Sequence, residues 1–194
     1  MKKIKWQNDY SFRDHPKDWT GLSPRKFMTY QTYINRIKPG ICGTYVSAAL
    51  VHYVVKADRG YDLEMPTLLA ALKPKIEERQ SYLGTFAWDL KNGLNELLAE
   101  DGVYRARYHL VSNPIVLREL SKDKPLPVIV GTTRLFGSKY GNHWLLVYAF
   151  GYNAKGQLFY RAYDNHGRTM AVIPASQTLA CVWLEKIKSE KVGN

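Results

Sequence analysis

The stretch GICGTYVSAAL, residues 40–50, places a cysteine between two glycines immediately before an apolar run. Apolar residues continue at helical spacing as far as Val54, so we predict a helix that begins at Cys42 and ends near Lys56. The apolar spacing indicates that this helix is buried on one face or more. Cys42 therefore stands at the entrance of a buried helix rather than inside it.

The position of Cys42 has a chemical consequence. The unpaired N–H groups and the dipole at a helix start favour an anion, so we expect a lowered pKa for this thiol. Its thiolate would be a nucleophile, and Gly43 would let a substrate or an oxyanion come close to the backbone. The alternative is that Cys42 is a small apolar residue, which is the commoner role of an isolated cysteine.

A nucleophilic cysteine needs a base, and His143 is the histidine that the pattern favours. It follows Gly141-Asn142 and directly precedes the apolar run WLLVY, residues 144–148. A polar imidazole at the start of such a buried strand suggests a functional role. A ring that caps a strand end toward water is the alternative. The other histidines are expected in the core, at a strand end or at the surface, with His52 too far along the helix to reach Cys42; they are His15, His52, His109 and His166.

The chain after His143 predicts a β-hairpin, with strands over 143–152 and 158–163 and a turn at 153–156. The hairpin returns Asp164 and Asn165 to the neighbourhood of His143, so either residue can hold the imidazole ring. An ordinary Asx turn before Gly167 is the alternative.

The predicted elements run from helices to strands along the chain. Besides the helix of Cys42, we predict helices over 24–33, 66–76 with an interruption at Pro74, 85–98 with Thr85 as its cap, and 115–120 with Asn113 as its cap. We predict strands over 103–110, 127–133, 143–152, 158–163, 170–173 and 180–187. This order predicts an α+β fold, in which a helical part packs on a mostly antiparallel sheet.

The length of 194 residues and a hydrophobic content of 45 % suit one domain with a core of its own. We expect a single domain over 1–194, made of a wrapping N-terminal segment 1–40, a helical part 41–102 and a sheet part 103–190. No apolar stretch approaches about 20 residues, so we expect no transmembrane segment. MKKIKWQNDYSF at the start lacks the apolar run of a secretory signal, so we expect a cytoplasmic protein if the chain is complete, and an extracellular or cell-surface one if a leader was removed.

The net charge of +11 favours anionic surroundings, but the basic residues are dispersed and form no known nucleic-acid module. We therefore expect no nucleic-acid partner. Cys181 lies in an apolar run and is expected to be a buried structural thiol, although a bridge to Cys42 stays open. Without CxxC or HExxH spacing, we expect neither a metal site nor a cofactor.

Three segments together resemble the papain-like cysteine peptidases: Gly40-Ile41-Cys42-Gly43 at a helix start, Gly141-Asn142-His143-Trp144 at a strand start, and Tyr163-Asp164-Asn165 at the end of the next strand. The closest resemblance is to the bacterial C39-like, or bacteriocin-processing-like, branch, and it covers about residues 30–190. It implies a papain-like fold with Cys42 as nucleophile, His143 as base and Asp164 as the residue that orients the base.

The resemblance also implies an oxyanion hole. The family's oxyanion glutamine normally stands about six residues before the cysteine, where this chain has Arg36. We expect Asn35 to replace it, because a side-chain amide can donate to an oxyanion, with the Cys42 backbone N–H as second donor. Gln31 and Asn165 are the alternatives.

The activity that the resemblance implies is that of a cysteine peptidase, or of a related thiol amidohydrolase or acyltransferase. Its substrate would be a peptide-type amide bond in a peptide or protein, and no cofactor would be needed. The sequence does not separate hydrolysis from acyl transfer, and it leaves the oligomeric state open. The alternative is a catalytically weak or inactive binding module of the same fold, for a peptide or a cell-wall-type ligand.

Overall fold

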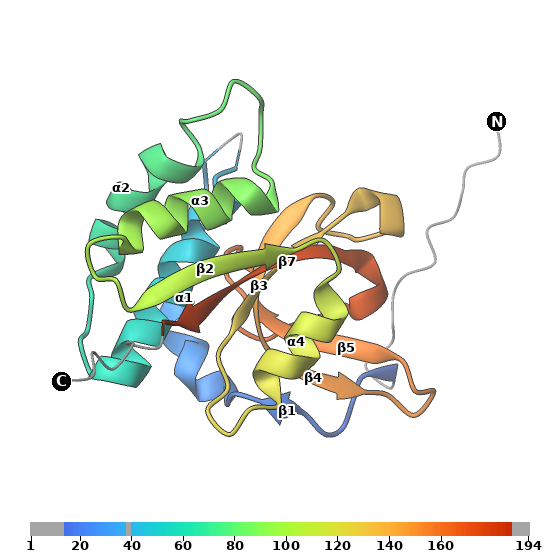
Figure 1. Cartoon of the computed structure of the whole chain (residues 1–194). Helices are drawn as coiled ribbons and strands as arrows, with labels where there is room; N and C mark the ends of the chain where they lie inside the picture. Colours follow the sequence, from blue (N-terminus) through green and yellow to red (C-terminus); the bar gives the residue numbers. More distant parts are fainter. Residues whose placement is uncertain (1–13, 38–39, 188–194) are drawn as a thin grey trace, which may run out of the picture.

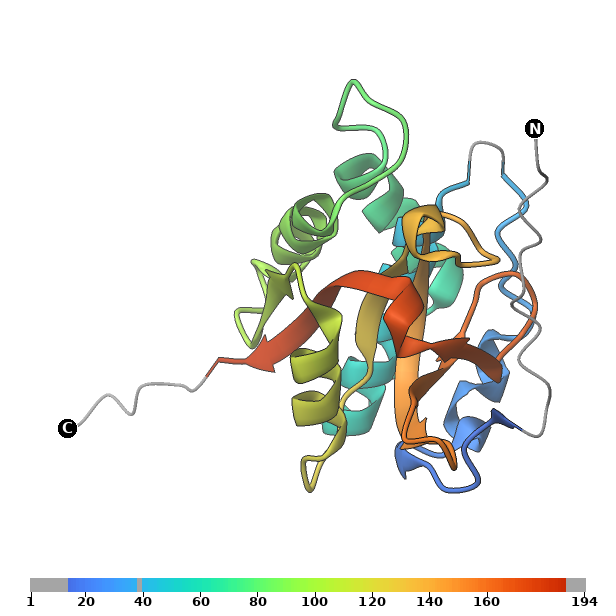
Figure 2. The ribbon, with the colours of Figure 1, turned by 90° about the vertical axis from the view of Figure 1, so that its right-hand side faces the viewer.

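The computed structural model describes residues 14–37 and 40–187 and has an α+β fold, as predicted. One antiparallel sheet carries helices on both faces (Figures 1 and 2). The helices are α1 (Cys42–Arg59), α2 (Met65–Ile76), α3 (Ala87–Leu98) and α4 (Ser112–Leu120). The strands are β1 (Thr20–Gly21), β2 (Tyr104–His109), β3 (Val128–Thr132), β4 (His143–Tyr152), β5 (Leu158–Tyr163), β6 (Ala171–Pro174) and β7 (Thr178–Lys186).

The strand order across the sheet is β2-β7-β3-β4-β5-β6, and β1 pairs with β4 at Ala149 and Phe150. All pairs are antiparallel. The β4–β5 hairpin forms as predicted, with Leu146 opposite Tyr163. Because β5 ends at Tyr163, the residues that follow it return to the end of β4 where His143 lies.

Strand β4 is buried on both faces and separates two apolar clusters. Trp144, Leu146 and Tyr148 pack in the cluster that includes α1, α2 and α3. Leu145 and Val147 point the opposite way, into the cluster that includes α4. This alternation follows from the two-residue period of a strand, and it explains why β4 is apolar from Trp144 to Phe150.

The helix predicted over 24–33 is a 3₁₀ helix that ends at Tyr30, and α1 extends to Arg59 instead of ending near Lys56. Helices α2, α3 and α4 also differ from the predictions. Helix α2 continues through Pro74 as far as Ile76 instead of breaking there. Helix α3 begins at Ala87, because the Asp89 carboxylate accepts a hydrogen bond from the Phe86 N–H at 2.8 Å, and Thr85 is not its cap. Helix α4 begins at Ser112, so Asn113 lies inside it and accepts a hydrogen bond from Tyr160 Oη at 2.5 Å.

The N-terminal segment from residue 14 to residue 37 packs on α1 and β4. Phe27 and Tyr30 of the 3₁₀ helix η2 (Pro24–Tyr30) are fully buried, and the Phe27 ring stacks on Tyr148 at 4.1 Å between ring centroids. Tyr30 Oη lies 2.7 Å from His52 Nδ1, and His52 Nε2 lies 3.0 Å from Asp62. His52, expected on a helix face or in the core, is therefore a buried histidine.

The open edge of the sheet at β2 is closed by a side chain of α3. Asn95 Oδ1 accepts a hydrogen bond from the Ala106 N–H at 2.7 Å, and Asn95 Nδ2 donates to the Ala106 carbonyl at 3.2 Å. An unpaired strand edge is a template for pairing with another chain, so Asn95 both joins α3 to the sheet and blocks this edge at Ala106. None of the helices in the described ranges has the length and apolarity that crossing a membrane requires.

We expect Asn95→Ala to lower the free energy of unfolding by about 1–3 kcal/mol, because both backbone groups of Ala106 lose their partner. Urea unfolding followed by circular dichroism measures the change. Asn92→Ala is the matched control on the same helix, because Asn92 is exposed and contacts Lys91 alone among the described hydrogen bonds. Equal stability losses in the two variants would contradict this role of Asn95.

Candidate active site

Cys42 is the first residue of α1, and its thiol is partly buried. Burial raises the pKa of this thiol, and the nearby charge of Glu77 acts in the same direction. Hydrogen bonds from the backbone of Trp144, and from the N–H groups of Gly43 and Cys42 itself, oppose the increase without reversing it. The expectation of a lowered thiol pKa is therefore wrong for this site, because desolvation outweighs the helix dipole.

The first turn of α1 is capped from two other segments of the chain. Asn35, turned so that its amide oxygen faces the helix, accepts hydrogen bonds from the Ile41 N–H at 3.1 Å and the Cys42 N–H at 3.2 Å. Glu77 Oε1 accepts from the Thr44 N–H at 3.1 Å. These acceptors use the positive end of α1 that the sequence analysis assigned to the thiolate.

Asn35 therefore lies beside Cys42, where an oxyanion residue is expected, and its oxygen caps the helix once the amide is turned toward these N–H groups. The N–H of Cys42, expected as the second oxyanion donor, is the group that it caps. An oxyanion would have to replace the Asn35 oxygen on this N–H.

His143 begins β4 and is 7 % exposed. Its Nε2 lies 2.8 Å from the backbone carbonyl of Asp164. A carbonyl oxygen can only accept, so Nε2 carries the hydrogen and Nδ1 carries the free lone pair. Burial lowers the pKa of the ring to about 4, against the raising effect of the carbonyl, so the imidazole is neutral at pH 7 and can act as a base.

Asp164 contacts His143 through its main-chain carbonyl and not, as predicted, through its carboxylate. The carboxylate accepts hydrogen bonds from Tyr140 Oη and from the N–H groups of His166 and Arg168, each at 2.9 Å. The Asx turn considered as the alternative thus forms, and it shapes the loop that presents the carbonyl to His143.

Two aromatic side chains that the sequence analysis did not assign to the site flank the ring of His143. Tyr140 stacks on it, with ring centroids 5.5 Å apart and an interplanar angle of 13°. The exposed His166 packs on it at 4.3 Å and 35°. His166 was expected only to face solvent, and Tyr140 has no signal beyond its place three residues before His143.

The thiol and the imidazole belong to adjacent parts of the structure, because the backbone of Trp144, the residue after His143, lies close enough to the Cys42 thiol to lower its pKa. The Trp144 indole N–H donates to the carbonyl and hydroxyl oxygens of Thr85, both at 3.1 Å. Among residues 14–37 and 40–187, no direct hydrogen bond joins Cys42 Sγ to the His143 ring. The resting arrangement is a neutral thiol near a neutral imidazole.

The two alternative amide residues occupy different environments. Asn165 is fully buried with φ of 46°, and its Nδ2 donates to the Trp144 carbonyl at 2.9 Å. Its own carbonyl accepts from the Asn35 N–H at 2.8 Å, so it fixes the segment that carries Asn35. Gln31 lies exposed at the end of η2 and has no described contact with Cys42.

Gly43 serves packing rather than the approach of a ligand. A Cβ atom at this position would lie 2.8 Å from Thr85 Oγ1 and 3.0 Å from Leu90 Cδ1. The expectation that this glycine opens the backbone to a substrate is therefore wrong, because the space is filled by the segment before α3 and by α3 itself.

The remaining predicted positions lie away from this site. Cys181 is fully buried and forms no disulfide with Cys42, and burial raises its pKa to about 12, so the thiol stays protonated at pH 7. His109 is exposed at the end of β2, where its ring hydrogen-bonds the backbone of Val111. In the described part of the chain, no three His, Cys, Asp or Glu side chains gather as a metal site would need.

Comparison with known proteins gives little beyond this geometry. No family model matches the sequence, and none of the curated proteins matches it. One solved structure that matches is the 2.05 Å crystal structure of the Amb a 11 cysteine protease, a major ragweed pollen allergen, in its proform. The sequence identity is 12 % and the TM-score 0.45, and the match covers 94 % of this chain and 68 % of that chain. Similarity at this level assigns no activity to the chain.

The pKa of His143 predicts a pH dependence of stability. The folded-state pKa of about 4 lies below the ordinary value of 6.5, so the unfolded chain binds the proton first as the pH falls. The neutral His143 ring therefore adds about 3 kcal/mol to the free energy of unfolding above pH 6.5, relative to pH 4. This stabilisation is lost as the pH falls from 6.5 to 4. We expect His143→Gln to lose less stability than the parent over this interval in urea unfolding. His109→Gln, which removes an exposed imidazole, is the control, and parallel curves for the parent and His143→Gln would contradict the assignment.

Proposed function

We propose that the protein is a thiol-dependent hydrolase or acyltransferase that acts on a peptide-type amide bond, with Cys42 as nucleophile and His143 as base. One observation carries the proposal. A cysteine at a helix start meets the backbone next to a buried histidine, and the Asp164 carbonyl fixes that histidine in the tautomer with a free Nδ1. A nucleophile, a base and a group that orients the base are the components that acyl transfer needs.

The protonation states favour general-base catalysis over a preformed ion pair. As Cys42 Sγ bonds to the carbonyl carbon of the amide, its proton passes to His143 Nδ1 and the carbonyl electrons move to the oxygen. The oxyanion then collapses, the C–N bond breaks, and His143 returns the proton to the leaving amine. Water activated by the same ring hydrolyses the thioester and regenerates the thiol, whereas an amine in place of water would give acyl transfer.

The oxyanion is proposed to bind at the Cys42 N–H with Asn35 beside it. Asn35 supports this role through its position, since its amide lies within hydrogen-bond distance of that N–H. The amide must turn its Nδ2 toward the oxyanion when substrate arrives, because only that nitrogen can donate.

We further propose that the chain is a papain-like peptidase of the C39-like type. Its supports are the order of Cys42, His143 and Asp164 along the chain, the helix that begins at the cysteine and the antiparallel strand that begins at the histidine. The substrate is proposed to be a peptide or protein.

The second candidate function is a binding module of the same fold without turnover. The capped start of α1 favours it, because Asn35 and Glu77 occupy N–H groups that an active site would offer to its substrate. Substrate turnover distinguishes the two functions.

We expect Cys42→Ala to abolish cleavage of a peptide library, scored by mass spectrometry of the products, because the acyl-enzyme can no longer form. His143→Ala should reduce the rate by roughly 10²- to 10⁴-fold through loss of the base. Cys181→Ala is the control thiol substitution and should cleave at nearly the parent rate, since Cys181 is buried elsewhere.

Cleavage that persists in Cys42→Ala would overturn the proposed nucleophile. Binding of library peptides without cleavage by the parent, and unchanged in Cys42→Ala, would establish the binding module instead.

A further inference from the structure

The carboxylate of Glu77 lies at the start of α1, next to the candidate nucleophile. Its Oε1 accepts hydrogen bonds from Thr44 N at 3.1 Å and from Thr44 Oγ1 at 3.2 Å. A Cβ atom at Gly43 would lie 3.3 Å from the same oxygen. Glu77 thus places a carboxylate against the first turn of the helix that Cys42 begins, although the two residues are far apart in the sequence.

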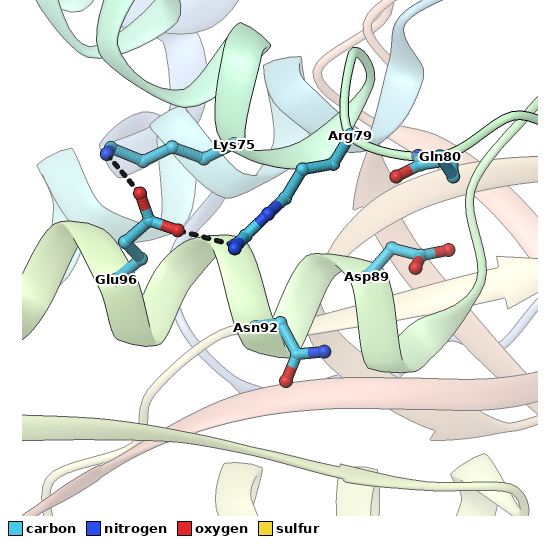
Figure 3. Close-up of a pocket in the computed structure, with 6 residues that line it drawn as sticks. All are labelled: Lys75, Arg79, Gln80, Asp89, Asn92 and Glu96. Atoms are coloured by element: carbon cyan, nitrogen blue, oxygen red, sulfur yellow. Dashed lines mark hydrogen bonds and ion pairs between the residues drawn. The ribbon is translucent and has the colours of Figure 1, made fainter.

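The charge of Glu77 has no cationic partner in the described part of the chain. The nearby cations Lys75 and Arg79 both bind Glu96 of α3, at 2.7 and 2.5 Å (Figure 3). These two ion pairs fix the end of α2 on α3 on either side of Glu77 in the sequence. Glu77 therefore keeps its position while its charge stays unpaired.

The positive end of a helix stabilises one anion well, and two anions there repel each other. Glu77 is partly buried, so solvent screens its field less than that of a surface carboxylate. Burial raises the pKa of Glu77 and Asp89 adds to the effect, while both Thr44 hydrogen bonds favour the charged form. The charge of Glu77 in turn raises the pKa of the Cys42 thiol. His143, which faces the site from β4, is neutral at pH 7 and offers no compensating charge.

We propose that Glu77 is a positioning residue that occupies the positive end of α1 and holds Cys42 as a protonated thiol until substrate binds. The inference rests on the proposed role of Cys42 as nucleophile. A resting thiol reacts slowly with alkylating agents and oxidants, because the thiolate is the reactive form. The site would then depend on His143 to take the proton at the moment of attack.

The test is the pH dependence of Cys42 alkylation by iodoacetamide, with the adduct located by mass spectrometry. Glu77→Gln keeps an oxygen acceptor for Thr44 and the side-chain volume but removes the charge. We expect the variant to label roughly threefold to tenfold faster than the parent at pH 7, with equal limiting rates at high pH. Glu78→Gln is the matched control, because it removes the adjacent charge, which pairs with Lys73 on the surface, and should follow the parent.

A Glu77→Gln profile that coincides with those of the parent and Glu78→Gln would overturn the proposal. If Glu77→Gln does not fold, Glu77→Asp withdraws the carboxylate from α1 by one methylene and should still label faster than the parent; equal labelling would overturn the proposal. The two proposals can be told apart. If the library peptides are not cleaved but Glu77→Gln still changes the alkylation profile, the proposed function is wrong and the role of Glu77 stands.

Discussion

The packing of α1 against β4 is the contact on which the rest of the structure depends. Both elements are buried, and each begins with a residue of the candidate site, Cys42 on α1 and His143 on β4. Burial of the apolar face of the helix on the strand therefore aligns the two starts. The helix and the strand thus place Cys42 and His143, while the segment of Asn35 and the loop after β5 hold the groups that contact them.

Burial also decides the chemistry of the site. A helix start favours a thiolate, and a carbonyl partner favours an imidazolium. Desolvation acts against both charged forms and prevails at both groups, which leaves a neutral thiol and a neutral base. The capping of α1 by Asn35 and Glu77 strengthens this result, because the helix N–H groups already have acceptors.

The segments around the site are connected through main-chain groups. Asn165 joins the carbonyl of Trp144 to the backbone of Asn35, and the loop after β5 presents the Asp164 carbonyl to His143. The Asp164 carboxylate stabilises that loop by holding its N–H groups and Tyr140. The Asp164 carboxylate therefore affects the His143 imidazole only indirectly, because it fixes the loop whose Asp164 carbonyl is hydrogen-bonded to the ring.

The sequence by itself determined the helices and strands with a clear apolar period, and the residues that directly precede or follow them in the chain. The helix of Cys42, the β4–β5 hairpin and the return of Asp164 toward His143 follow from apolar spacing and turn residues, which are local signals. Tertiary structure alone decided which atom of Asp164 meets the ring, that Asn35 and Glu77 cap α1, and that His166 packs on His143. These contacts join segments that are distant in sequence or depend on side-chain direction, so the apolar pattern of the sequence does not predict them. The direction of the thiol pKa belongs to the same group, because desolvation is a property of the folded surroundings and not of a position in a helix.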